Sequence, residues 1–90
     1  MKVGDLVWYN CAGSKQTGIV LEICIKDGTA YPHGKRTEMI KIHWYTIGYG
    51  PRPAMYSADG TRLFGSDHPT AYVPTKGTSG IKIFKVISEA

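Results

Sequence analysis

Two stretches of the chain alternate apolar and polar residues at every second position, and they predict its two central β-strands. In residues 17–25 the odd positions are apolar: Ile19, Leu21, Ile23 and Ile25. In residues 39–46 the even positions are apolar: Ile40, Ile42 and Trp44. A period of two places alternate side chains on opposite faces of a sheet, whereas a helix would scatter them around its circumference. We therefore expect both apolar rows to face one shared core.

The two predicted strands are expected to form an antiparallel pair across the loop 26–38. This pairing brings Glu22 near Lys41 and His43 on the face that points away from the core. A charge pair across two strands contributes at most about 1 kcal/mol, so it would add little to the stability of the fold.

Shorter signals predict strands, turns and loops in the rest of the chain. We expect strands at 3–9, 71–73 and 81–87, a hairpin at 54–64 that turns at Asp59-Gly60, and loops at 10–16, 47–53 and 65–80. The closing strand has ambiguous faces, because its apolar residues cannot all point inward without a bulge. Gly18 marks a place where a side chain would hinder a bend or a close backbone approach. With 11 Gly, 5 Pro and no long helical pattern, the 90 residues predict one small all-β domain.

Charge and cysteines place few limits on function. The net charge of +4 permits an acidic partner such as nucleic acid, but Lys and Arg are spread along the chain, as on any mildly basic surface. In a hairpin of 3–9 with 17–25, Cys11 and Cys24 lie about 25 Å apart, beyond disulfide reach. We expect free thiols and a reducing, cytoplasmic location. From the polar start we expect no signal peptide, and because no apolar run is long enough to span a bilayer, we expect no membrane partner.

Three short motifs resemble those of small SH3-like barrels. They are Gly4-Asp-Leu-Val7, Gly18-Ile-Val20 and Ile42-His-Trp44, followed by a short closing strand. The first two are similar to the opening of the KOW and Tudor-like branch, although the interval between them is about one residue shorter and the loop less basic. The layout also resembles short uncharacterised proteins of tailed phages. The resemblance implies an SH3-like barrel of about five strands with an insertion at roughly 47–80, and, for a phage protein, the host cytoplasm or the virion.

Two surfaces are candidates for binding. The first is the outer face of the third strand, extended by neighbouring cations and an exposed tryptophan: Trp8, Lys35, Arg36, Lys41, His43 and Tyr45. Cations interleaved with aromatic rings can hold phosphates while bases stack, although the same residues could simply cover the edge of a barrel. The second surface combines aromatic residues with a rigid proline loop: Tyr49, Pro51, Arg52, Pro53 and Tyr56. It would suit an extended peptide, or it could be only an ordered loop.

The sequence gives little support for metal, cofactor or catalytic chemistry. The candidate ligands lack the spacings of metal sites: Cys11, Cys24, His33, His43 and His68. No nucleophile can be tied to Asp67-His68, and Gly48-Tyr-Gly50 lacks the rest of a phosphate-binding loop. We therefore expect a non-enzymatic binding module without a cofactor. The dispersed charge favours a protein partner or self-association, with DNA or RNA binding as the alternative.

Overall fold

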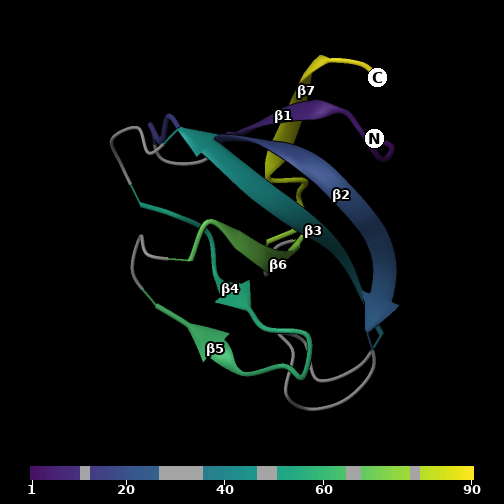
Figure 1. Cartoon of the computed structure of the whole chain (residues 1–90), viewed down its shortest axis with the longest axis vertical. Helices are drawn as coiled ribbons and strands as arrows, with labels where there is room; N and C mark the ends of the chain where they lie inside the picture. Colours follow the sequence, from purple (N-terminus) through teal and green to yellow (C-terminus); the bar gives the residue numbers. More distant parts are fainter. Residues whose placement is uncertain (11–12, 27–35, 47–50, 65–67, 78–79) are drawn as a thin grey trace.

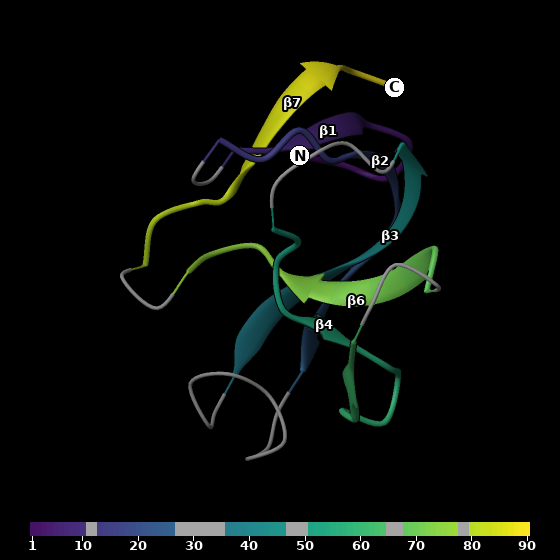
Figure 2. The same cartoon turned by 90° about the vertical axis from the view of Figure 1, so that its left-hand side faces the viewer.

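The computed structural model of the chain describes residues 1–10, 13–26, 36–46, 51–64, 68–77 and 80–90. In these residues, seven strands form one antiparallel sheet. They are β1 (Leu6–Tyr9), β2 (Thr17–Lys26), β3 (Thr37–Thr46), β4 (Met55–Tyr56), β5 (Arg62–Leu63), β6 (Thr70–Pro74) and β7 (Phe84–Ser88). Their order across the sheet is β5-β4-β6-β3-β2-β1-β7. β2 and β3 are the longest strands, and they run well beyond β1 and β7 (Figures 1 and 2).

The predicted all-β class is therefore confirmed, together with the predicted pair at its centre. β2 and β3 are antiparallel, and Glu22 lies opposite Lys41 as expected. The predicted hairpin at 54–64 is formed by β4 and β5, and Gly60 in its turn has a φ of +90°. The predicted strand at 71–73 is β6. Whether the bent sheet is an SH3-like barrel stays a prediction.

Backbone hydrogen bonds tie the region after β6 to the start of β7. The amide of Ile83 donates to the carbonyl oxygen of Thr75 at 3.1 Å, and the backbones of Lys76 and Lys82 form an isolated antiparallel β-bridge. On the other side, the amide of Asn10 donates to the carbonyl oxygen of Ile83 at 2.8 Å. The chain near Ile83 is thus bonded both to the end of β1 and to the end of β6, which lie on opposite sides of β2 and β3 in the sheet order.

The core confirms one of the two predicted apolar rows and contradicts the other. Ile40, Ile42 and Trp44 are buried as expected, and they pack with Val7, Tyr9, Val20, Met55, Ala71, Val73 and Phe84. In β2, however, the buried residues are Gly18 and Val20, whereas Leu21, Ile23 and Ile25 are 43%, 38% and 54% exposed. The predicted buried row of odd positions in β2 is therefore wrong.

A β-bulge explains part of this difference. The register of β2 against β3 shifts between Val20 and Glu22, so Leu21 is an extra residue. A single extra residue reverses which positions face the core. Ile23 then lies opposite the core residue Ile40, but so near the end of the hairpin that no other described strand covers it.

A similar irregularity resolves the faces of the closing strand. Leu6 pairs with Ser88 but Val7 pairs with Val86, so Ile87 is the extra residue. Phe84 is buried and Ile87 is exposed. The bulge that the sequence required is present, and it expels Ile87 from the interior.

Gly18 confirms its predicted role at a close approach of two strands. A Cβ atom at this position would lie 2.7 Å from the carbonyl oxygen of His43 and 2.8 Å from a side-chain carbon of Ile42. Any larger residue would push β3 away from β2 at the level of the buried Ile42.

Candidate binding surfaces

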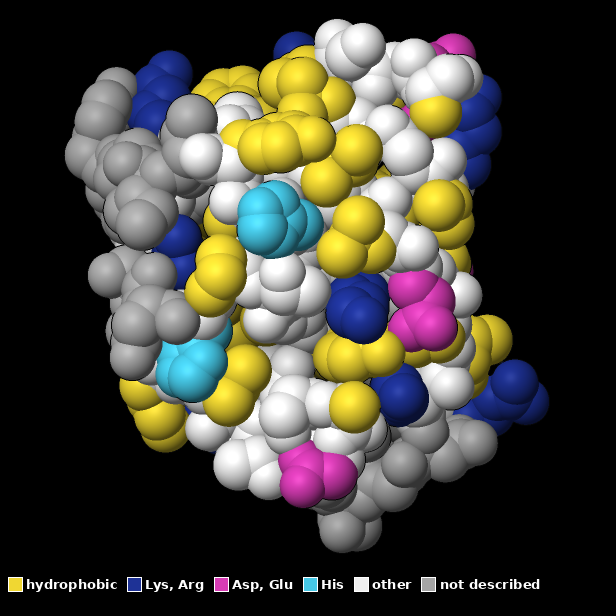
Figure 3. All heavy atoms as spheres, viewed as in Figure 1, with side chains coloured by type: hydrophobic (Ala, Val, Ile, Leu, Met, Phe, Trp, Pro, Cys, Tyr) yellow, Lys and Arg dark blue, Asp and Glu magenta, His cyan; other side chains and the backbone are white. Residues whose placement is uncertain are grey.

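The outer face of β3 brings together Lys41, His43 and Tyr45, as predicted. Nδ1 of His43 lies 2.8 Å from the Thr70 hydroxyl, and its ring meets the ring of Tyr45 edge to face at 6.0 Å. Tyr45 is 58% exposed, whereas Lys41 and His43 are half-buried. In the face drawn in Figure 3, hydrophobic side chains surround a central histidine, and a basic side chain lies against an acidic one below it.

An acidic group interrupts the positive charge of this face. Glu22 lies opposite Lys41, and its Oε2 accepts a hydrogen bond from the Tyr72 hydroxyl at 2.9 Å. The Nζ of Lys26 lies over the ring of Tyr72, 4.8 Å from its centre. These residues form a mixed cluster on three adjacent strands, so the outer face does not present a continuous row of cations.

Two of the residues expected to extend this face have different surroundings. Trp8 is half-buried rather than exposed; its Nε1 donates to the carbonyl oxygen of Ser14 at 3.1 Å, and Lys15 covers its ring at 5.0 Å. Arg36 is exposed at the start of β3, where it lines a groove together with Lys76. Lys35 lies outside the described residues.

The second predicted surface is largely turned inward, which corrects that hypothesis. The guanidinium of Arg52 lies over the ring of Trp44 at 5.3 Å, and its nitrogen atoms are buried without a hydrogen-bond partner among the described residues. Burial lowers the pKa of this guanidinium. Tyr56 is only 9% exposed and packs against Met39. Pro53 is buried and Pro51 exposed, while Tyr49 lies outside the described residues.

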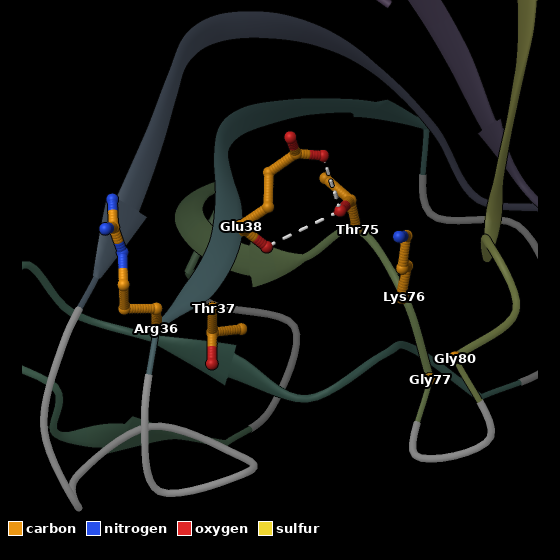
Figure 4. A pocket seen from close by; sticks show the side chains of 7 residues that line it. All are labelled: Arg36, Thr37, Glu38, Thr75, Lys76, Gly77 and Gly80. Atoms are coloured by element: carbon orange, nitrogen blue, oxygen red, sulfur yellow. Dashed lines mark hydrogen bonds between the residues drawn. The ribbon is translucent and has the colours of Figure 1, made fainter.

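A groove that the sequence did not reveal lies where the start of β3 meets the chain after β6. Its two hollows share Glu38 and Thr75; their other lining residues are Arg36, Thr37, Lys76, Gly77 and Gly80 in the first and Met1, Ile23, Ile40 and Lys82 in the second. Figure 4 shows Glu38 and Thr75 pointing toward each other between Arg36 and Lys76. The Thr75 hydroxyl donates to Oε1 of Glu38 at 2.9 Å. No sequence signal links these residues, because they come from separate segments of the chain.

The size and lining of the groove indicate what it can accommodate. The two hollows measure about 290 and 210 Å³, whereas sites for drug-sized ligands usually measure roughly 300–1,000 Å³. The second hollow has a mixed lining, with apolar side chains from Met1, Ile23 and Ile40 and polar ones from Glu38, Thr75 and Lys82. A groove of this size suits one or two side chains of a bound polypeptide better than a whole small molecule.

Among the described residues, no strand pairs with the second half of β2 along its outer edge, beside this groove. From Leu21 to Lys26, β3 is the only described strand that pairs with β2, because the pairing with β1 ends at Ile19. The last bonds to the β1 side are the two that Val20 makes with Gly4 and Asp5. Figure 1 likewise shows no labelled strand along the lower outer edge of β2.

The backbone groups of Ile23 and Ile25 point toward that open edge. In β3, the carbonyl oxygen of Glu38 accepts from Thr75 and the amide of Trp44 donates to Pro69, so the even residues of β3 bond on the β6 side. Ile25 lies opposite Glu38, and Ile23 lies opposite Ile40. Because Glu38 and Ile40 bond on the β6 side, the β2 residues opposite them exchange no backbone hydrogen bonds with β3. The N–H and C=O groups of Ile23 and Ile25 therefore face the outer edge of β2.

The cysteines and histidines show no metal site in the part of the chain that the structure describes, where no three of His, Cys, Asp and Glu come together. Cys24 is a free thiol, as predicted, and partial burial raises its pKa. Cys11, His33 and Asp67 lie outside the described residues, as do residues 48–50, and His68 is half-buried.

Comparisons with models of protein families, with curated proteins and with solved structures find no match for this chain. Within the described residues, no helix has the length and apolar character needed to cross a membrane.

Proposed function

We propose that this chain is a non-enzymatic binding module that recognises a protein partner, with a fold of the SH3-like type. The observation that carries the proposal is the outer edge of β2 from Leu21 to Lys26, along which no described strand pairs, beside a groove partly lined by the apolar side chains of Met1 and Ile23. An edge strand of this kind is a template for another strand, and proteins usually protect such edges with charges, proline or a covering segment. Here the edge displays three large apolar side chains.

The geometry of the edge supports binding of an extended polypeptide. Ile23 and Ile25 present backbone donors and acceptors to the edge at alternate positions, which is the pattern that an added β-strand uses. Side chains of the added strand that point to the same face as Ile23 would lie against Ile23 and Met1, which line the second hollow. Main-chain hydrogen bonds would supply affinity, and the groove would supply selectivity.

Nucleic-acid binding, the alternative, has weaker support from the geometry of the outer face. Single-stranded nucleic acids are usually bound by a basic path along which rings are free to stack. On this face Glu22 lies opposite Lys41, and the ring of Trp8 is covered by Lys15. The aromatic rings and cations therefore contact each other rather than lining a common path.

A binding comparison tests the proposal. Displayed random peptides are selected on the wild-type chain, and the selected peptides are then measured against Ile25→Lys and against Ile87→Lys. Ile87 is a matched control, because it is similarly exposed but lies in β7, which is separated from β2 by β1 in the sheet order. We expect Ile25→Lys to weaken binding about tenfold or more and Ile87→Lys to leave it unchanged, since a bulky charge at the edge hinders strand addition.

The same preparation is tested with labelled single-stranded DNA and RNA at two salt concentrations. We expect no binding that responds to salt. An affinity that falls steeply with salt would favour the nucleic-acid alternative, because release of counterions accompanies binding to phosphates. Failure to select any peptide, together with a strictly monomeric chain, would contradict the proposal.

A further inference from the structure

We infer that the partner at the open edge of β2 is a second copy of this chain, related to the first by a two-fold axis that passes between the two Cys24 residues. This inference rests on the proposed function and specifies its partner. It would place the strands β3 and β2 of one copy and β2 and β3 of the other in one continuous sheet, in that order.

The sequence of the open edge is self-complementary. Antiparallel pairing of Glu22-Ile-Cys-Ile-Lys26 with itself about Cys24 places Glu22 opposite Lys26 of the second copy. It also places Ile23 opposite Ile25 and Cys24 opposite its own equivalent. Two-fold registers centred on Ile23 or on Ile25 would lack both charge pairs. Opposite charges directly across two strands stabilise a pair, whereas like charges destabilise it. A two-fold interface needs such self-complementarity.

The backbone has the correct phase for this register. Ile23 and Ile25 present their N–H and C=O groups to the open edge, so each can exchange two hydrogen bonds with the other's equivalent in the second copy. Cys24 lies between them and bonds on the β3 side, so the two Cys24 residues form a pair without hydrogen bonds at the axis. In such pairs the Cα atoms approach to about 4.5 Å.

Both faces of the joined sheet would gain contacts. On the concave face, Ile23 and Ile25 of both copies, which are 38% and 54% exposed in one chain, would cover one another. On the outer face, Glu22 would lie between Lys41 of its own chain and Lys26 of the second copy. Tyr72 already holds Glu22 through its hydroxyl and contacts Lys26 through its ring, so both charged groups lie on the face where they would meet.

Complementary charge reversals test this register. Glu22→Lys and Lys26→Glu each replace two attractive pairs of the dimer by two repulsive ones. We therefore expect each variant alone to dimerise at least about tenfold more weakly than the wild type. In an equimolar mixture, one variant carries lysine at both positions and the other carries glutamate at both. Each cross-strand pair of the mixed dimer therefore joins opposite charges, and sedimentation equilibrium should show that the mixture regains near wild-type affinity.

The mixture is a strict control, because each variant keeps the same intrachain neighbours alone and in the mixture. Thermal unfolding should show that both variants are folded. Ile25→Lys should abolish the dimer, whereas Ile87→Lys should not affect it. Any of three outcomes would overturn the inference: equal dimer affinity in all variants, loss of the dimer in Ile87→Lys, or a mixture that dimerises no more tightly than its two components alone.

A second measurement locates the axis. In a Cys11→Ser chain, Cys24 is the only thiol, since the sequence has two cysteines. Diamide takes up the two protons and two electrons released when two thiols form a disulfide, and at a Cα separation of about 4.5 Å the bond can form without backbone movement. We expect rapid covalent dimers that Glu22→Lys reduces about tenfold and that the charge-reversed mixture restores.

The outcomes also separate this inference from the proposed function. A wild-type chain that stays monomeric at millimolar concentration, yet binds selected peptides in a manner that Ile25→Lys abolishes, would refute the dimer and leave the protein-binding module. A dimer with the expected response to charge reversal supports both. A monomer that binds no peptide contradicts both.

Discussion

The two halves of β2 are consecutive in the chain, both rich in apolar residues, and used in different ways. From Thr17 to Val20 the strand is bonded on both edges, to β1 and its preceding turn and to β3, and Val20 is completely buried. From Leu21 to Lys26 it is bonded only to β3 among the described strands, and its large apolar side chains are exposed. The boundary between the halves is the bulge at Leu21. Hydrophobic alternation therefore predicts a strand, but it does not predict whether another element covers that strand.

The sharpest test of the comparison is hydrogen exchange along β2. The amide of Val20 donates to the backbone carbonyl of Asp5 at 3.0 Å, whereas the amide of Ile25 faces the open edge. We expect the Ile25 amide to exchange about 10³-fold faster or more, because core amides exchange only through large openings. NMR on dilute protein measures both rates.

Self-association would slow exchange at Ile25, so the experiment is repeated on the Glu22→Lys chain. Equal protection of the two amides in that chain, at a concentration where it is monomeric, would mean that another segment covers the edge. The difference between the two halves of β2 would then disappear, and with it the basis for strand addition.

A pair of truncations compares the halves energetically. Ile42 lies opposite Val20 and is fully buried, whereas Ile25 lies opposite Glu38 and is 54% exposed. Ile42→Ala should lower the free energy of unfolding by about 2–5 kcal/mol, the usual cost of removing a buried Ile side chain and leaving a cavity. Ile25→Ala should change it by less than about 0.5 kcal/mol in the monomer. Urea unfolding at low protein concentration measures both, and similar losses at the two positions would refute the difference in burial.

Much of the fold follows from the local pattern, but the face reversal in β2 does not. The even-numbered row of β3 and the opposition of Glu22 and Lys41 follow from periodicity and pairing alone. The bulge at Leu21 leaves no mark in the sequence, since Leu is an ordinary strand residue. The closing strand is different, because its crowded apolar residues signal that a bulge is needed, and Ile87 is the residue expelled.

The candidate sites were harder to predict because they depend on the bending of the whole sheet. Lys41, His43 and Tyr45 share a face through strand periodicity, and that prediction is confirmed. The sequence predicts Arg52 on a binding surface because it belongs to a rigid proline loop beside aromatic residues, but it packs over the core residue Trp44. The chain after β6 joins the start of β3 in the groove only through the pairing of β6 with β3, which no local signal encodes.

The smallest expected effect concerns the turn that keeps β1 beside the first half of β2. The carboxylate of Asp5 accepts hydrogen bonds from the backbone amides of Ala90 at 2.9 Å and Lys2 at 2.8 Å. These bonds, chiefly that from Ala90, lower the pKa of Asp5 below its ordinary value of 3.8. Because the folded pKa lies below the unfolded one, this stabilisation is complete above about pH 4 and is lost as the pH falls through the folded value.

We therefore expect Asp5→Asn to be less stable than the wild type at pH 7 and to lose less further stability in acid, since an amide group cannot accept both bonds. Urea unfolding between pH 6 and pH 2 measures this. Asp59→Asn is the control: hydrogen bonds from Ser57 and Thr61 lower the pKa of Asp59 to about 2, but it lies in the distant β4–β5 turn. Both substitutions should weaken the dependence of the free energy of unfolding on acid pH. Only Asp5→Asn should speed hydrogen exchange at the amide of Val20, and neither should alter exchange at the amide of Ile25. Faster exchange at Ile25 in the Asp5→Asn chain would show that the two halves of β2 are held by the same contacts.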